Sequence, residues 1–227
     1  MSMERTLESL RDGKFVLLHD SNSRENEVDI VISANAVKPH HVATMRQDAG
    51  GLICVALQSR IADSFGTPYL TDIYREALPK FKIFNATIPN DIPYDERSAF
   101  SITVNHRRTF TGVTDVDRAL TISELGKLGA KAVNSDLVEE FGREFRSPGH
   151  VHLLRAAKGL LTERRGHTEL VVALAEIASV TPVICICEML DATTNRALSG
   201  DDAKEYGKKH GMEFLEGSEI VETKEGG

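Results

Sequence analysis

The longest apolar stretch of the chain, residues 170–187, most limits the folds that it can adopt. Glu176 and Pro182 interrupt this stretch, and a proline cannot continue a helix because it lacks a backbone N–H and clashes with the preceding turn. The pattern predicts a helix over residues 168–179 and a buried strand over residues 183–188 rather than a membrane span. Both elements must lie inside a core, and 227 residues are enough for one sizeable core and short for two.

The other apolar runs alternate irregularly between strand and helix patterns. Strands are predicted at residues 15–19, 28–32, 52–57, 100–104, 150–154, 183–188 and 212–215; helices are predicted up to Gly13, over residues 38–50, 59–65, 121–133 and 168–179, and from Ser199 to Gly211. Since the chain has no dinucleotide or P-loop motif, no repeat and no linker, we predict the α+β class. We expect a single three-layer domain over residues 1–227, a mixed β-sheet flanked by helices.

For three segments the prediction is based on composition or on a single local signal rather than on a clear periodic pattern. Residues 67–97 hold four of the seven prolines, so we predict a long irregular segment there, of the kind that is usually functional or mobile. Thr121 and Glu124 have the spacing of a capping box and predict a helix that starts at Thr121. The polar residues 219–227 are predicted to be a frayed tail.

Charge and cysteine content exclude several classes of protein. A net charge of −7 leaves no electrostatic footprint for nucleic acid, so we expect no nucleic-acid partner and a local basic patch for any anionic ligand. Such a patch is predicted from Arg143, Arg146, Arg155, Lys158, Arg164 and Arg165. Cys54, Cys185 and Cys187 form neither a disulfide framework nor a zinc motif, and the last two should face one side of their strand. Residues 1–14 do not resemble a signal peptide, so a cytoplasmic protein without a membrane anchor is expected.

The segment Arg24-Glu25-Asn26-Glu27-Val28-Asp29 brings three carboxylates together. If this segment is extended, Glu25, Glu27 and Asp29 share one face at spacings of about 6.6–6.8 Å. Like charges that close repel one another unless a cation lies among them, and Mg²⁺ prefers oxygen ligands of this kind. A solvated acidic loop, with Arg24 paired locally, is the alternative.

The segment Arg164-Arg165-Gly166-His167-Thr168-Glu169 precedes the apolar helix. Gly166 permits a tight turn, and Thr168 is a suitable N-cap. A helix N-terminus flanked by arginines favours a phosphate, and His167 could bind a metal or transfer protons. Alternatively, Arg164, Arg165 and His167 are exposed loop residues.

Two further titratable groups lie at strand ends. Pro148-Gly149 predicts a turn that places His150 at the start of a strand, with His152 pointing the same way. Glu188 follows a buried apolar run, where a carboxylate suits the role of general base. Structural roles for both are the alternative.

Taken together and in this order, these pieces resemble the 3,4-dihydroxy-2-butanone 4-phosphate synthase family of the riboflavin pathway. The family pattern R-E-N-E-G-D is similar to residues 24–29 with Val28 in place of glycine, and R-G-G-H-T-E is similar to residues 164–169 with Arg165 in place of glycine. Family P-G-H and C-E motifs correspond to residues 148–150 and 187–188. Residues 111–113 and 117–118 match a further family stretch.

The resemblance implies a lyase that depends on Mg²⁺ (or Mn²⁺) and converts D-ribulose 5-phosphate to L-3,4-dihydroxy-2-butanone 4-phosphate and formate. It implies metal ligands Glu25 and His167, catalytic residues His150 and Glu188, and substrate-binding residues Arg24, Glu25, Asp29, Arg164, Arg165, Gly166, His167, Thr168 and Glu188. It also implies a homodimer with active sites at the interface, here as a stand-alone synthase. Residues 67–97 are expected to close over the sugar phosphate. A metal-dependent sugar-phosphate isomerase or aldolase, or a nucleotide- or RNA-binding module, remains the alternative.

Overall fold

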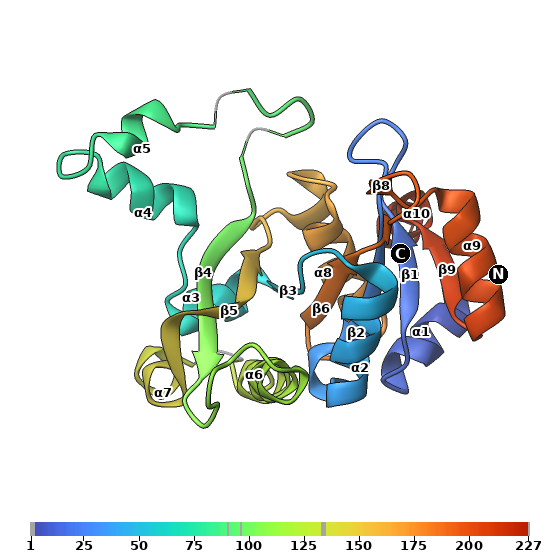
Figure 1. Cartoon of the computed structure of the whole chain (residues 1–227), viewed down its shortest axis with the longest axis horizontal. Coiled ribbons are helices and arrows are strands. Elements are labelled where there is room, and N and C mark those ends of the chain that lie inside the picture. Colours follow the sequence, from blue (N-terminus) through green and yellow to red (C-terminus); the bar gives the residue numbers. More distant parts are fainter. Residues whose placement is uncertain (1–2, 90, 96, 133–134, 227) are drawn as a thin grey trace.

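One mixed β-sheet runs through the middle of the molecule, in a computed structural model that describes residues 3–89, 91–95, 97–132 and 135–226 (Figure 1). Within these residues it has seven strands: β1 (Val16–His19), β2 (Val28–Ser33), β3 (Cys54–Leu57), β4 (Phe100–His106), β5 (Phe145–Arg155), β6 (Val183–Glu188) and β9 (Glu213–Glu216). Their order is β4-β5-β3-β6-β2-β1-β9. β3 is parallel to β5 and β1 to β9, and the other neighbours are antiparallel. The short strands β7 (Leu190–Asp191) and β8 (Arg196–Ala197) pair separately.

Helix α8 (His167–Ile177) covers the middle of one face of the sheet, with α1 (Met3–Arg11) and α10 (Gly217–Glu225) beside it. All residues of α8 from His167 to Ala175 are buried. Ile184 and Ile186 of β6 face this layer, as do Leu10 and Ile220 of the flanking helices. The apolar stretch therefore forms the buried helix and the buried strand that its sequence predicts.

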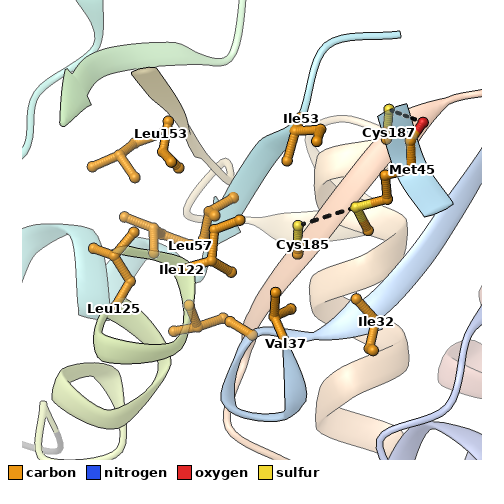
Figure 2. Packing of buried hydrophobic residues seen from close by; sticks show 14 of the residues in the cluster. Ile32, Val37, Met45, Ile53, Leu57, Ile122, Leu125, Leu153, Cys185 and Cys187 are labelled. Carbon is orange, nitrogen blue, oxygen red and sulfur yellow. Dashed lines mark hydrogen bonds between the residues drawn. The ribbon is translucent and has the colours of Figure 1, made fainter. Parts of the chain in front are cut away.

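Five helices lie on the opposite side of the sheet or along its margin: α2 (Pro39–Thr44), α3 (Ser59–Phe65), α6 (Asp115–Gly129), α7 (Val138–Glu144) and α9 (Gly200–His210). Figure 2 shows part of this core, where Cys185 Sγ lies 3.7 Å from Met45 Sδ and Cys187 Sγ lies 3.9 Å from the Met45 carbonyl oxygen. Because side chains alternate along a strand, the two cysteines share this face while Ile184 and Ile186 take the other. The three-layer α+β fold with a mixed sheet is confirmed.

The start of α6 corrects a local prediction. The helix begins at Asp115, and its N-cap is Thr114, whose hydroxyl accepts a hydrogen bond from Asp117 N at 3.1 Å. Thr121 is buried inside the helix, where its hydroxyl accepts from His106 N and donates to the Asp117 carbonyl. The spacing of Thr121 and Glu124 is therefore no capping box, since tertiary contacts occupy the threonine. The predicted end near Val133 lies outside the described residues.

Two segments predicted to be irregular are helical. Within residues 67–97 the chain forms α4 (Leu70–Ala77) and α5 (Ile83–Ala86), none of whose residues is buried. α4 contacts β4 at the margin of the sheet, and α5 contacts α4 (Figure 1). The frayed tail predicted for residues 219–227 is wrong for the described part, because α10 buries Ile220 and Val221 and contacts α8. The sequence could not show that the apolar residues of α10 pack against α8. Gly227 lies outside the described residues.

The strand directions bring several polar residues to one edge of the sheet. β1 and β6 end where β2 and β3 begin, so that His19 pairs with Val28, Asp29 with Glu188, and Cys54 with Ile186. The N-terminus of α8 lies at the same edge, where His167 contacts Glu25. Among the described residues, no helix is both long enough and apolar enough to cross a membrane.

Candidate active site

A cavity of about 340 Å³ opens at this edge of the sheet. It is lined by all of the predicted substrate-binding residues except Arg165 and Gly166: Arg24, Glu25, Asp29, Arg164, His167, Thr168 and Glu188. These residues come from the loop before β2, from β2 itself, from the N-terminal end of α8 and from the end of β6. The fold therefore gathers residues that are up to 164 positions apart (24 to 188) into one concave surface.

The acidic segment reaches the cavity as a turn rather than as an extended strand. Residues 22–25 form turns, and the strand starts only at Val28, so the predicted common face of Glu25, Glu27 and Asp29 is wrong. Asn26 has the left-handed backbone conformation in this loop, with φ +55°. Val28, in place of the family glycine, is buried as the first residue of β2 and pairs with His19.

Three side chains have the composition of a metal site, and two of them, Glu25 and His167, line the cavity. One potential ligand atom each from Asp20, Glu25 and His167 lies within 4.8 Å of the other two. Asp29 adds a buried oxygen, Oδ1, that has no hydrogen-bond partner and lies 3.7 Å from His167 Nε2. Carboxylates with an imidazole fit a hard divalent cation that also keeps water or substrate oxygens as ligands. Sequence reasoning missed Asp20, whose only local signal is its position directly after an apolar strand.

The protonation of these groups is strongly coupled. Burial by itself would lower the pKa of His167, but the charge of Asp29, the hydrogen bond to Glu25 and the nearby Asp20 outweigh it and raise this pKa to about 9. Burial raises the pKa of Asp29 to about 7, against the influence of His167. For Glu25, burial is opposed by the His167 hydrogen bond and by Arg24, and its pKa is lowered. Without a metal, the imidazole therefore holds a proton among carboxylates.

Two guanidinium groups, those of Arg24 and Arg164, also line the cavity, and Arg24 Nη1 lies 3.0 Å from Glu25 Oε1. Asp95 Oδ2 lies 2.6 Å from Arg24 Nη2 and 2.5 Å from Arg164 Nε, and Arg164 also pairs with the buried Glu169. A Cβ atom at Gly166 would lie 2.4 Å from Arg164 Nη1 and 2.9 Å from Arg24 Nη2, so a larger residue would require both guanidinium groups to shift. Two arginines at the N-terminus of an eleven-residue helix are suited to binding a phosphate.

The N-cap of α8 is Gly166, so the prediction that Thr168 is the cap is wrong; Thr168 lies in the first turn, at the cavity wall.

The predicted basic patch is not gathered at the site, because only Arg164 of its six members lines the cavity. Arg165 pairs with Glu225, Arg155 with Asp63, and Arg146 donates to backbone oxygens of the loop after β4. Tyr94 and Asp95, which sequence reasoning missed, line the cavity from a segment without any motif.

The two residues that the resemblance implies to be catalytic have different surroundings. Glu188 lies in the cavity, where its Oε2 accepts a hydrogen bond from Leu52 N at 2.7 Å. His150 is exposed and does not line the cavity. Asn105 holds it, accepting from His150 N at 2.8 Å and donating to Nδ1 at 3.1 Å. Within one chain, the structure does not bring His150 and Glu188 together in this cavity.

Comparisons with known proteins agree over nearly the whole chain. The family model described as 3,4-dihydroxy-2-butanone 4-phosphate synthase matches residues 4–223. The 3,4-dihydroxy-2-butanone 4-phosphate synthase of Methanothermobacter thermautotrophicus is 49% identical, over 97% of this chain and 95% of its own length. The Archaeoglobus fulgidus protein of the same name is 50% identical, over 98% and 93%. A solved structure of a 3,4-dihydroxy-2-butanone 4-phosphate synthase in complex with two magnesium ions has a TM-score of 0.80 and 27% identity, covering 100% of this chain and 99% of its own.

Proposed function

This chain belongs to the 3,4-dihydroxy-2-butanone 4-phosphate synthase family, and on that premise we propose that it converts D-ribulose 5-phosphate to L-3,4-dihydroxy-2-butanone 4-phosphate and formate in riboflavin biosynthesis. One observation carries the proposal: the carboxylate–imidazole pair of Glu25 and His167 and the two guanidinium groups of Arg24 and Arg164 line the same cavity. A five-carbon sugar phosphate needs both, a cation near its hydroxyl and carbonyl oxygens and a cationic site for its phosphate.

For the metal, we assign Glu25 and His167 as ligands of Mg²⁺ or Mn²⁺. Their side chains are in contact at 3.2 Å, and both Asp20 and Asp29 lie beside them. The related structure with two magnesium ions supports a hard divalent cation at this site. When bound, such a cation would stabilise negative charge on adjacent sugar oxygens during enolisation.

For the phosphate, we assign Arg24, Arg164 and the first turn of α8 that carries Thr168. In the structure one oxygen of Asp95 pairs with both guanidinium groups, so a dianionic phosphate would compete with it for them. Gly166 keeps space for both arginines at the helix start. Binding of the sugar phosphate is therefore expected to change the contacts of Asp95.

For proton transfer, we assign Glu188 and His150 as the acid–base pair, with His150 of the partner subunit completing each site in a homodimer. Exposed apolar side chains follow the strand that anchors His150: Phe110 is 94% exposed, and Val113 and Val116 are more than half exposed. Clustered exposed apolar residues are typical of a surface that pairs with another protein. A dimer through this surface would let His150 serve a site other than its own.

We further propose that the only substrate is this small sugar phosphate and that the protein works in the cytoplasm without nucleic acid or membrane partners. Three free, buried cysteines are consistent with a reducing compartment. The net charge of −7 speaks against a nucleic-acid surface.

The test is to incubate the purified protein with ribulose 5-phosphate, with and without Mg²⁺, and to measure formate while following phosphorus-containing species by NMR. We expect formate that depends on the metal, together with one new phosphorylated four-carbon product. Consumption of the substrate without formate would indicate an isomerase or aldolase instead. No turnover with any divalent metal would contradict the proposal.

A further inference from the structure

Asp20, the residue after β1, contacts the backbone of the acidic loop, and its Oδ2 lies 3.6 Å from Arg24 Nη1. Its Oδ2 accepts a hydrogen bond from Glu25 N at 3.0 Å, and its Oδ1 accepts one from Glu27 N at 3.2 Å. The Asp20 side chain is fully buried, and Asp20 N donates to the Glu27 carbonyl at 3.3 Å. Both carboxylate oxygens and the backbone of Asp20 therefore hold the loop from which Glu25 extends.

His19, the last residue of β1, contacts the same loop from its other side. Its Nδ1 donates to Glu216 Oε2 at 2.6 Å, and its Nε2 lies 3.1 Å from Asn26 Oδ1. Asn26 is the residue with the left-handed backbone, a conformation that costs about 1 kcal/mol or more for a residue with a Cβ unless contacts maintain it. The imidazole thus connects the end of β9 to the strained position of the loop.

We propose that His19 and Asp20 are positioning residues that keep Glu25 against His167 before any metal arrives. Glu25, Glu27 and Asp29 repel one another, which favours opening of the loop that carries them. Arg24 offsets this repulsion at the Glu25 side chain, where its Nη1 lies 3.0 Å from Oε1, whereas Asp20 and His19 restrain the loop at its backbone and at Asn26. Asp20 fixes the backbone at Glu25 and Glu27, and His19 fixes Asn26 between them. The ligand pair is then preorganised, and the cation does not have to order the loop when it binds.

A competing role for Asp20 is that of a third metal ligand, since its carboxylate lies near the Glu25 carboxylate and the His167 imidazole. The two roles differ in the metal-free protein. A positioning residue restrains the loop without metal, whereas a residue that acts only as a ligand does not. Because this role deepens the proposed metal site, it rests on the proposed function, yet its contacts exist without the cation.

The experiment compares the wild type with Asp20→Asn by hydrogen–deuterium exchange of the metal-free protein and by titration with Mn²⁺. We expect amides of residues 21–27 to exchange about tenfold faster in the variant, because the amide group of asparagine accepts through only one atom. We expect Mn²⁺ to bind about 10- to 100-fold more weakly, as when other outer contacts of metal sites are removed. Unchanged exchange with weaker Mn²⁺ binding would overturn the positioning role in favour of a ligand.

His19→Phe tests the proposed role of His19, because phenylalanine keeps an aromatic ring and loses the contacts with Glu216 and Asn26. We expect faster exchange around Asn26 and weaker Mn²⁺ binding, and no change in either would overturn the role of His19. Lys204→Met is the matched control, since Lys204 binds the other oxygen of Glu216 at 2.9 Å and should affect neither measurement. If Asp20→Asn does not fold, His19→Phe carries both measurements. If the wild type binds no Mn²⁺, the proposed metal site fails, and the exchange rates still decide the positioning role.

Discussion

Arg164 and Arg165 are adjacent in the chain, yet the structure gives them unrelated surroundings. Arg164 faces the cavity and pairs with Asp95 and Glu169. Arg165 is 57% exposed in its side chain and pairs with Glu225 of α10. An exposed ion pair of that kind contributes little to stability. The resemblance implies that both bind substrate, and the geometry supports this for Arg164 alone.

The first prediction compares these two residues in matched variants. Arg164→Met should raise KM for ribulose 5-phosphate about 10- to 100-fold, because a charge-assisted hydrogen bond to phosphate is lost. Arg165→Met should change KM less than about twofold. Steady-state kinetics at saturating Mg²⁺ checks both variants. Equal effects would show that Arg165 reaches the substrate after all.

The second prediction concerns pH and depends on His167. Its pKa is raised to about 9 in the metal-free protein, so the imidazole is protonated at neutral pH and must lose that proton to bind a metal. The association constant for Mn²⁺ should therefore rise about tenfold per pH unit from about pH 7 and level off near pH 9. Titration calorimetry in buffers of different ionisation enthalpy would detect the released proton. Affinity independent of pH over this range would exclude His167 as a ligand with this pKa.

At the scale of elements, the C-terminal helix illustrates how packing overrides local composition. The residues from 219 onward are mostly polar, and their sequence does not distinguish a tail from a surface helix. In the fold, Ile220 is fully buried against the layer of α8, and Glu216 of the preceding strand holds His19. β9 and α10 therefore both cover the core and support the edge of the sheet where the cavity lies.

The third prediction tests that packing. Ile220→Ala should lower the free energy of unfolding by about 2–5 kcal/mol, since it leaves a cavity in a closed layer. Ser218→Ala, at an exposed position of the same helix, should change it by less than about 0.5 kcal/mol. Denaturation by urea, with the slope compared between variants, gives both values. Equal stabilities would mean that α10 frays in solution.

The segment over residues 67–97 differs from α10, because neither of its helices, α4 and α5, contains a buried residue. Figure 1 shows α4 at the margin of the sheet with α5 beside it, while Tyr94 and Asp95 of the same segment line the cavity. Local structure with so few buried contacts opens at little cost in free energy. Asp95 of this segment contacts both Arg24 and Arg164, so the position of the segment should depend on whether these arginines bind a phosphate.

The fourth prediction follows from this link. If the segment closes over the substrate, limited proteolysis within residues 67–97 should slow several-fold when ribulose 5-phosphate and Mg²⁺ are both present. The Glu188→Gln variant is suitable, since slower catalysis would preserve the substrate during the digestion. Equal cleavage rates with and without both ligands would contradict closure.

At the scale of the whole molecule, the position of His150 is the main discrepancy between motif and geometry. The residue belongs to a specific motif, yet Asn105 holds it outside the cavity that contains Glu188. A homodimer resolves this if His150 of the partner subunit enters the site. Phe110, Val113 and Val116 then supply apolar area for the pairing.

The fifth prediction is a complementation test of that arrangement. Glu25→Gln and His150→Asn should each be nearly inactive alone. After their subunits are mixed and exchanged, about a quarter of the wild-type activity should return, because each heterodimer then has one site without either substitution. If His150 acts in its own chain, every site of the mixture carries one substitution and no activity returns. The mass in solution, measured by light scattering, should be that of a dimer.

The features that could be predicted from the sequence are those determined by neighbouring residues, and the features that were missed depend on tertiary contacts. The runs that form β2, β6 and α8 were predictable because periodicity and the proline at position 182 are local signals. Arg24, Glu25, Asp29, His167 and Glu188 could be predicted as site residues because their chemistry is concentrated in short motifs, and in the structure they line one cavity. Asp20, Tyr94 and Asp95 were missed, since no motif marks them and only the fold brings them near His167 or into the lining of the cavity.

The sequence by itself determined the class of the fold, the family and the chemical groups available, because apolar periodicity and short motifs are properties of neighbouring residues. Only the tertiary structure decided which arginine faces the cavity, which threonine caps α6, whether the C-terminus packs and where His150 lies. Each of these depends on the register of a sheet whose neighbouring strands come from opposite ends of the chain, such as β1 and β9. Register and packing arise from burial over the whole molecule, and no local pattern encodes them.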